Sequence, residues 1–289
     1  MEHRAKTLID RIAKKRPPYA NTPIRHPSVK PALTVYLTCL LCFQNAYSET
    51  NSTSCASSFI PGEVANYKVT WMGIPLAWSE HTTSSFEENG RKLIRIRMVS
   101  RNYKAYSYIY KVNDVTEVVI DPETALPLRL DVIVNEGSIH KSHLTTFYHD
   151  KKVAVFQDRI SKDIREVPIK SGTQDIFSFL YSARNRDFES LASLKHTLFV
   201  DGKLYDLSLK IRKEGRIKLP HHGKVACVQI EPIAEFDGLF LRKGKIFFWV
   251  SRQKHRMITC VEARVAVGRV KVKLHEISGT GDAFWDRKE

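Results

Sequence analysis

The chain has 289 residues, with 46 Lys and Arg against 31 Asp and Glu, so its formal net charge is +15 at pH 7. Such a charge would suit a nucleic-acid-binding protein, but the first fifty residues predict export and so argue against that class. No internal repeat is visible along the chain, and its length is compatible with one large domain or two lobes.

Residues 32–43 predict a cleavable secretory leader. They are apolar without one charge, and as a helix they would span about 18 Å, well short of the roughly 30 Å hydrocarbon core of a bilayer. Lys30 precedes them, and Ala46 and Ser48 are the small residues that a cleavage site requires. We therefore expect a leader over residues 1–48, cleavage after Ser48, a disordered linker over 49–58 and a periplasmic location.

The segment before this apolar run is long for an ordinary leader, and its prolines forbid a continuous helix. Two interpretations stay open. Translation starts at a non-standard codon near Val29, or the segment is a disordered basic extension.

The leader also changes the charge argument. Residues 1–48 carry eight Lys or Arg and two acidic residues, which leaves +9 of the +15 for the remaining chain. Many of its basic residues alternate with apolar ones, as in residues 91–97, and this pattern is typical of the solvated face of a sheet. The alternative is attraction to an anionic surface of lipid head groups. Nucleic acid is not an expected partner.

The cysteines are Cys39, Cys42, Cys55, Cys227 and Cys260. The residues before Cys42 and Cys55 do not fit a lipidation site. Cys227 and Cys260 lie in strand-like runs, and a disulfide would require their Cα atoms within about 7 Å. If residues 245–251 form a strand between them, the separation is about 9 to 10 Å, and buried free thiols are expected instead.

From residue 59 onward, the alternation of apolar and polar residues predicts β-strands. It is clearest in residues 67–71, 93–98, 128–132 and 207–211. Turn residues follow at short intervals, among them Asn89-Gly90, Asp121-Pro122, Asp201-Gly202 and Glu214-Gly215. We expect a mainly β protein with an antiparallel curved sheet or half-barrel.

One segment has helical spacing instead. Ile176, Phe179, Leu180 and Ala183 would share one face of a helix over residues 174–184, with Thr173 as its N-cap. This helix would separate two β blocks, at about 59–170 and 195–278, within a single β-rich domain over 59–278. Residues 279–289 are expected to form a flexible tail.

A search for catalytic signatures finds no serine-hydrolase elbow, no zinc-binding helix motif and no phosphate-binding glycine loop. His221 and His222 are adjacent and would point to opposite sides of an extended segment, which disfavours joint metal ligation. The sequence therefore predicts a non-enzymatic protein with no cofactor and no metal.

Four motifs follow in an order that is typical of one family: residues 59–63 (FIPGE), 121–128 (DPETALPL), 175–181 (DIFSFLY) and 238–251, which contains GLF and GKIFFWVS. Over about 59–278 the chain resembles the exported bacterial proteins called domain of unknown function 3108. The resemblance implies export and a β-rich fold, but no reaction. A weaker similarity is to the half-barrel of the LolA and LolB lipoprotein carriers. In that family an acidic pair often follows the strand that contains the tryptophan of this last motif. The present chain departs from this pattern, because it has the basic stretch 252–256 there.

Three classes of function stay open. The first is binding of an apolar or lipid-like ligand, and the second is an envelope adaptor that docks a protein, a lipoprotein or an anionic membrane surface. The third is a hydrolase assembled from distant residues. For the first class we expect wall contacts from Trp71, Trp78, Tyr108, Phe179, Phe248 and Trp249, with Arg242 or Lys243 meeting an anionic head group at the mouth. The same aromatic residues would also fit an ordinary core.

Overall fold

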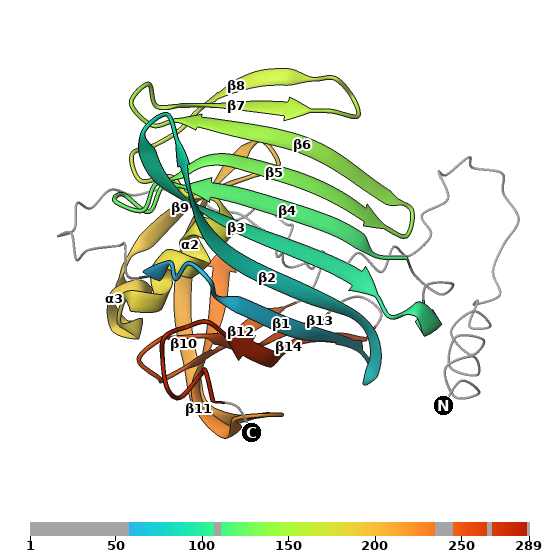
Figure 1. Ribbon diagram of the computed structural model, residues 1–289. Coiled ribbons are helices and arrows are strands. Elements are labelled where there is room, and N and C mark those ends of the chain that lie inside the picture. Colours follow the sequence, from blue (N-terminus) through green and yellow to red (C-terminus); the bar gives the residue numbers. More distant parts are fainter. Residues whose placement is uncertain (1–57, 107–110, 235–244, 265–267, 288–289) are drawn as a thin grey trace, which may run out of the picture. The chain divides into compact units, whose positions relative to one another are not determined.

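The computed structural model describes residues 58–106, 111–234, 245–264 and 268–287. Its strands form one antiparallel sheet in the order β8-β7-β6-β5-β4-β3-β2-β1-β14-β13-β12-β11-β10-β9 (Figure 1). The first block comprises β1 (Val64–Trp71), β2 (Ile74–Glu88), β3 (Arg91–Asn102), β4 (Asn113–Ile120), β5 (Pro127–Glu136), β6 (Ile139–Tyr148), β7 (Val153–Asp158) and β8 (Ile164–Pro168). The second comprises β9 (Lys195–Val200), β10 (Lys203–Leu219), β11 (Gly223–Ala234), β12 (Ile246–Ser251), β13 (Ile258–Arg264) and β14 (Arg269–Ser278).

The two blocks are joined by pairing between the first and the last strand, β1 and β14, in which Ala65 lies opposite Ile277. Between the blocks in sequence are the helices α2 (Ile176–Ser182) and α3 (Phe188–Ser193), with the short 3-10 helix η3 (Ala183–Asn185) between them. A further 3-10 turn, η2 (Lys104–Tyr106), follows β3. The predicted fold class, an antiparallel curved sheet or half-barrel of two β blocks separated by a short helix, is confirmed, and the sheet is not closed.

Strand β3 shows why the alternating sequence makes this sheet. Ile94, Ile96 and Met98 are buried, whereas Arg97 is exposed and Arg95 is half-buried. Arg95 pairs with Glu117 of β4 at 2.9 Å, on the solvated side of the sheet. The solvated basic face that the sequence predicted is therefore confirmed for this strand.

The largest core cluster lies between β3–β7 and helix α2. Its buried members include Ile96, Val118, Ile120 and Phe156 from the strands and Phe177 and Tyr181 from the helix. Phe199 of β9 belongs to the same cluster, and its ring and the ring of Phe147 of β6 form a T-shaped, edge-to-face contact with centroids 5.3 Å apart. Strands from the two ends of the sheet order thus share one core.

Asp201, in the turn between β9 and β10, strengthens this contact. Its carboxylate pairs with Lys141 and lies 3.3 Å from the imidazole of His143, both of β6. Its carbonyl oxygen accepts a hydrogen bond from Arg165 of β8 at 3.4 Å. The β9–β10 turn is therefore tied by polar contacts to the opposite end of the sheet, although the sheet order itself is open.

Cys227 and Cys260 are buried free thiols. Cys227 lies in β11 and Cys260 in β13, and β12 runs between them, with Ser251 opposite Cys227 and Trp249 opposite Cys260. An intervening strand keeps the two sulfurs too far apart for a disulfide. The prediction of separated buried thiols is confirmed.

The expectation of a flexible tail after residue 278 needs correction for residues 279–287. Trp285 is fully buried and packs with Met257 and Leu274 in a core cluster of β1 and β10–β14. Asp286 closes the tail into a loop, because its carboxylate accepts hydrogen bonds from the backbone N–H groups of Thr280 and Gly281 at 2.9 and 2.7 Å. The glycines suggested an exit from the fold, but they serve a tight turn that returns a tryptophan to the core.

Candidate ligand cavity

Helix α2 is placed by a capping box. Asp175 is the N-cap, and its carboxylate accepts hydrogen bonds from the N–H groups of Phe177 and Ser178, at 2.7 and 3.3 Å, while the Ser178 hydroxyl accepts one from the Asp175 N–H. Burial raises the pKa of the Asp175 carboxyl, and these hydrogen bonds oppose that effect. Thr173, the predicted N-cap, instead donates to the Lys170 carbonyl at 2.8 Å, so that prediction was wrong by two residues.

The helix has two apolar sides. Phe177 and Tyr181 face the large core cluster, whereas Ile176, Phe179, Leu180 and Ala183 face a cavity on the other side. The cavity lies between α2, α3 and strands β9–β13, and these helices run beside β9 and β10 in Figure 1. The helical spacing that predicted α2 therefore also forms one wall of the cavity.

The cavity is almost entirely apolar. The space between its walls, counted together with the open solvent at its mouth, is about 750 Å³. Its lining residues are Ile176, Phe179, Leu180, Ala183, Arg184, Phe188, Leu191, Leu198, Leu207, Leu209, Ile230, Pro232, Phe248, Val250, Arg256 and Ile258. Arg184 and Arg256 are the two ionisable members of this lining.

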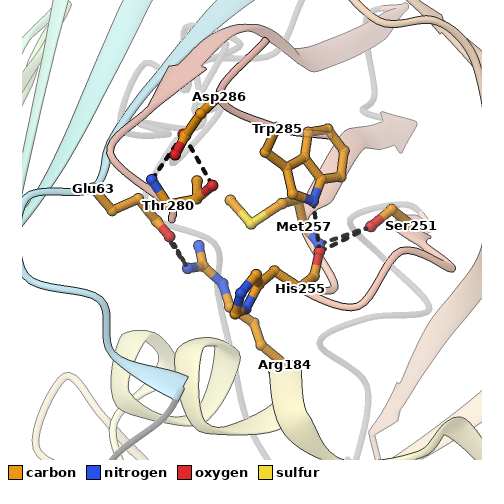
Figure 2. Close-up of polar contacts among 8 residues, drawn as sticks. All are labelled: Glu63, Arg184, Ser251, His255, Met257, Thr280, Trp285 and Asp286. Carbon is orange, nitrogen blue, oxygen red and sulfur yellow. Dashed lines mark hydrogen bonds and ion pairs between the residues drawn. The ribbon is translucent and has the colours of Figure 1, made fainter. Parts of the chain in front are cut away.

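Arg184 is buried and already has a charged partner. Its Nη1 donates to both carboxylate oxygens of Glu63, at 2.8 and 2.9 Å, and the two side chains are 7% and 0% exposed (Figure 2). The guanidinium carbon also lies 3.8 Å from the ring centroid of Tyr181. In the sequence Glu63 is only the last residue of the motif at 59–63, and nothing there indicates that it pairs with Arg184.

The titratable neighbours of this ion pair have shifted pKa values, mainly because they are buried. Burial raises the pKa of Tyr181 to about 12, and it also raises the pKa of Tyr67. Burial, together with the nearby Arg184 guanidinium, lowers the pKa of His81 to about 3. Around Arg184, therefore, the tyrosines and the histidine are neutral at pH 7, and Glu63 alone balances the arginine charge.

Arg256 lies in the turn between β12 and β13, and the tail holds this turn in place. The Ser251 hydroxyl accepts a hydrogen bond from the Met257 N–H at 2.9 Å, and the indole N–H of Trp285 donates to the carbonyl of His255 at 2.9 Å (Figure 2). The residue next to Arg256 on each side is thus anchored. The tail that the sequence presented as flexible helps to position one wall of the cavity.

Only some of the ligand-contact residues that the sequence suggested line the cavity. Phe179 and Phe248 line the cavity. Trp71 is buried in a separate cluster with Val69, Leu76, Ala77 and Val270, and Trp78 is half-buried on β2, outside the cavity. Tyr108, Arg242 and Lys243 lie outside the described residues.

Trp249 does not share a wall with Phe248, because successive residues of a strand point to opposite faces. Its side chain packs on the other face of β12, in the cluster that contains Cys227, Cys260 and Trp285. Gly215 of β10 lies under its ring, and a Cβ at that position would approach a ring carbon to 2.8 Å. The expectation that both aromatic residues contact one ligand therefore needs correction.

Among the described residues, no group of three or more His, Cys, Asp or Glu side chains is arranged to hold a metal ion. No helix in that part of the chain is long and apolar enough to cross a bilayer.

The fold and the cavity place the chain among proteins that have an open antiparallel sheet and an apolar cavity beside a helix. The chain belongs to the family described as Protein of unknown function (DUF3108), which matches residues 66–275. The resemblance inferred from the motifs is thus confirmed. No curated protein matches the chain. Among solved structures, a beta-barrel-like protein of domain of unknown function DUF1849 from Brucella abortus has a TM-score of 0.48 and 11% identity, covering 76% of this chain and 98% of that chain.

Proposed function

We propose that the protein binds a small molecule with an apolar body in the cavity between α2–α3 and β9–β13, without catalysing a reaction on it. The observation that carries the proposal is the lining, in which every residue except Arg184 and Arg256 is apolar. Apolar walls with a few convergent polar groups are typical of ligand sites. The walls of an apolar cavity forgo the dispersion contacts that a bound ligand would make with them.

We further propose that the binding takes place after export, in the periplasm or cell envelope. The support is the apolar run at residues 32–43 with its small residues near Ser48, which lie outside the described residues. Sequencing the amino terminus of the protein from a fractionated cell tests this proposal. A terminus at residue 49 in the periplasmic fraction is expected, and an uncut chain in the cytosol would contradict it.

A cavity-filling substitution tests the binding function. Ala183 faces the cavity and is half-buried, so Ala183→Trp should occupy the space and reduce binding of the neutral fluorescent probe N-phenyl-1-naphthylamine at least tenfold. Ala105→Trp is the matched control, because Ala105 is exposed on η2 and is not part of the lining.

The proposal predicts that the probe fluoresces with the wild-type protein and with Ala105→Trp, but not with Ala183→Trp. Circular dichroism must show that both variants keep the β fold. Equal probe binding by both variants, or none by the wild type, would contradict the proposal.

A second candidate function is docking of an envelope protein at the edge strand β8. This strand ends the sheet order, and Ile164 within it and Ile160 just before it are 64% and 56% exposed. An unpaired strand edge with exposed apolar side chains is a known template for strand addition. A photo-crosslinking residue at Ile164 should capture an envelope protein that the same residue at Ile133, an exposed position of β5, does not. Failure to recover any partner would oppose this function.

A further inference from the structure

The side chain of Arg256 has an unusual environment for a cation. It is half-buried and lines the apolar cavity. Its Nη1 donates one hydrogen bond, to the backbone carbonyl of Arg184 at 3.3 Å, and its guanidinium lies over the ring of Phe188 at 5.1 Å from the centroid. Within the part of the chain that the structure describes, the remaining N–H groups of this guanidinium have no protein acceptor.

Two nearby arginines, Arg184 and Arg252, differ from Arg256 because each has a carboxylate partner. Arg184 pairs with the buried Glu63, and Arg252 pairs with Glu214. Arg256 forms no ion pair with a described carboxylate, although its charge contributes to the lowered pKa of the exposed Asp187. The carboxylate of Asp187 is engaged at the start of α3, where it accepts hydrogen bonds from the N–H and the hydroxyl of Ser190, both at 2.7 Å.

Beside its apolar walls the cavity therefore has a guanidinium that forms no ion pair with a described carboxylate. Among the described residues no acidic side chain belongs to the lining, and the Glu63–Arg184 pair is neutral as a unit. A guanidinium offers several N–H donors in a planar fork that fits two oxygens of one oxyanion. A ligand that satisfies both features has an aliphatic body and an anionic head group.

We infer that the ligand is a single-chain anionic amphiphile, with its aliphatic chain between α2 and β9–β12 and its carboxylate or phosphate head group on Arg256. This inference rests on the proposed function and specifies the class of ligand. The turn around Arg256 is fixed by the hydrogen bonds of Ser251 and Trp285, so the guanidinium is held in place before the ligand arrives.

The test is competition against N-phenyl-1-naphthylamine by palmitate and by its uncharged methyl ester, which share one aliphatic chain. With the wild-type protein, palmitate should displace the probe at a concentration at least tenfold lower than methyl palmitate, because the carboxylate forms an ion pair with the guanidinium, whereas the ester offers it only a neutral carbonyl acceptor. Acetate and inorganic phosphate, which present the anion without the chain, should not displace the probe at the same concentrations.

In the Arg256→Gln variant, displacement of the probe should require about tenfold or more palmitate, whereas the concentration of methyl palmitate required should not change. Arg256→Lys should recover part of the loss, because it restores the charge but not the planar fork. The matched control is Arg252→Gln, since Arg252 also lies over Phe188, at 6.0 Å, but is paired with Glu214 and is not part of the lining. It should behave like the wild type.

The outcomes separate the head-group inference from the cavity itself. Equal displacement by palmitate and methyl palmitate, unchanged by Arg256→Gln, would overturn the head-group inference while the cavity still binds apolar molecules. Displacement by inorganic phosphate as effective as that by palmitate would overturn the amphiphile assignment. No probe binding by the folded wild type would overturn both the inference and the proposed function.

Discussion

Glu63 and Arg184 form a buried ion pair across 121 positions of the chain, with Nη1 at 2.8 Å from one carboxylate oxygen and 2.9 Å from the other. Glu63 immediately precedes β1, and Arg184 lies in η3 directly after α2. The pair therefore ties the start of the sheet to the segment that forms one wall of the cavity. Tyr181 and Tyr67 surround the guanidinium and exclude water from it.

Removing one member of this pair should be costly. Glu63→Ala leaves the buried guanidinium without a counter-charge, and the free energy of unfolding should fall by about 3 to 5 kcal/mol, as urea denaturation would measure. The control is Glu88→Ala, which removes the carboxylate partner of Arg129. Both side chains of this pair are partly exposed, unlike Glu63, so the loss should be less than about 1 kcal/mol. A similar, small loss in both variants would show that the buried pair has no special role.

The two cysteines should be unreactive in the folded protein. Burial raises the pKa of the Cys260 thiol to about 12 and also raises that of Cys227, so neither is a thiolate at neutral pH. Iodoacetamide should leave both unmodified in the native state and alkylate both in urea, as mass spectrometry of the peptides would show. A disulfide-linked peptide containing both residues would contradict the separation imposed by β12.

The fold was predictable because its signals are local. Alternation in runs such as residues 93–98 and the helical spacing from Ile176 to Ala183 reflect the geometry of one strand or one helix. The cavity was predictable only in part. Phe179 and Phe248 were found because they are aromatic, but Trp249 has the same residue type and points to the opposite face.

The residues that the sequence missed depend on contacts between distant segments. The sequence around Glu63 does not predict its contact with Arg184, and the sequence around Arg256 does not predict that it lines the cavity, because the partners come from other elements. Trp285 carried a usable signal, since a large aromatic residue in a supposed tail is better accommodated in a core than in water. The glycines around Thr280 obscured that signal.

The tail should contribute substantially to stability. Trp285 is fully buried, so Trp285→Ala should lower the free energy of unfolding by about 3 to 5 kcal/mol in urea denaturation. Arg287→Ala is the control, because Arg287 is exposed and only its guanidinium contacts the Phe284 ring, at 5.3 Å from the centroid. If the free energy of unfolding fell equally little in both variants, residues 279–287 would not be part of the folded core.

Asp201 predicts a specific dependence of stability on pH. Burial alone would raise its pKa, but the adjacent His143 and Lys141 side chains outweigh that effect and lower it to about 2. A folded-state pKa below the ordinary value means that the carboxylate stabilises the fold above about pH 4, and that this contribution is lost as the pH falls through 2.

Asp201→Asn should therefore be less stable than the wild type at pH 7. The difference should be at most about 1 kcal/mol, because the Asp201 side chain is 43% exposed, and it should vanish near pH 2. Urea denaturation at a series of pH values checks this. A difference of constant size at pH 7 and pH 2 would assign the effect to packing instead of charge.

The central claim is that the cavity between α2–α3 and β9–β13 holds a ligand, and native mass spectrometry tests it most directly. Wild-type protein purified from its native cells without added lipid should show a bound species whose mass matches an anionic single-chain lipid. The Ala183→Trp variant, purified in the same way, should lack it. A ligand-free mass for folded wild type, or the same bound species in both proteins, would contradict the claim.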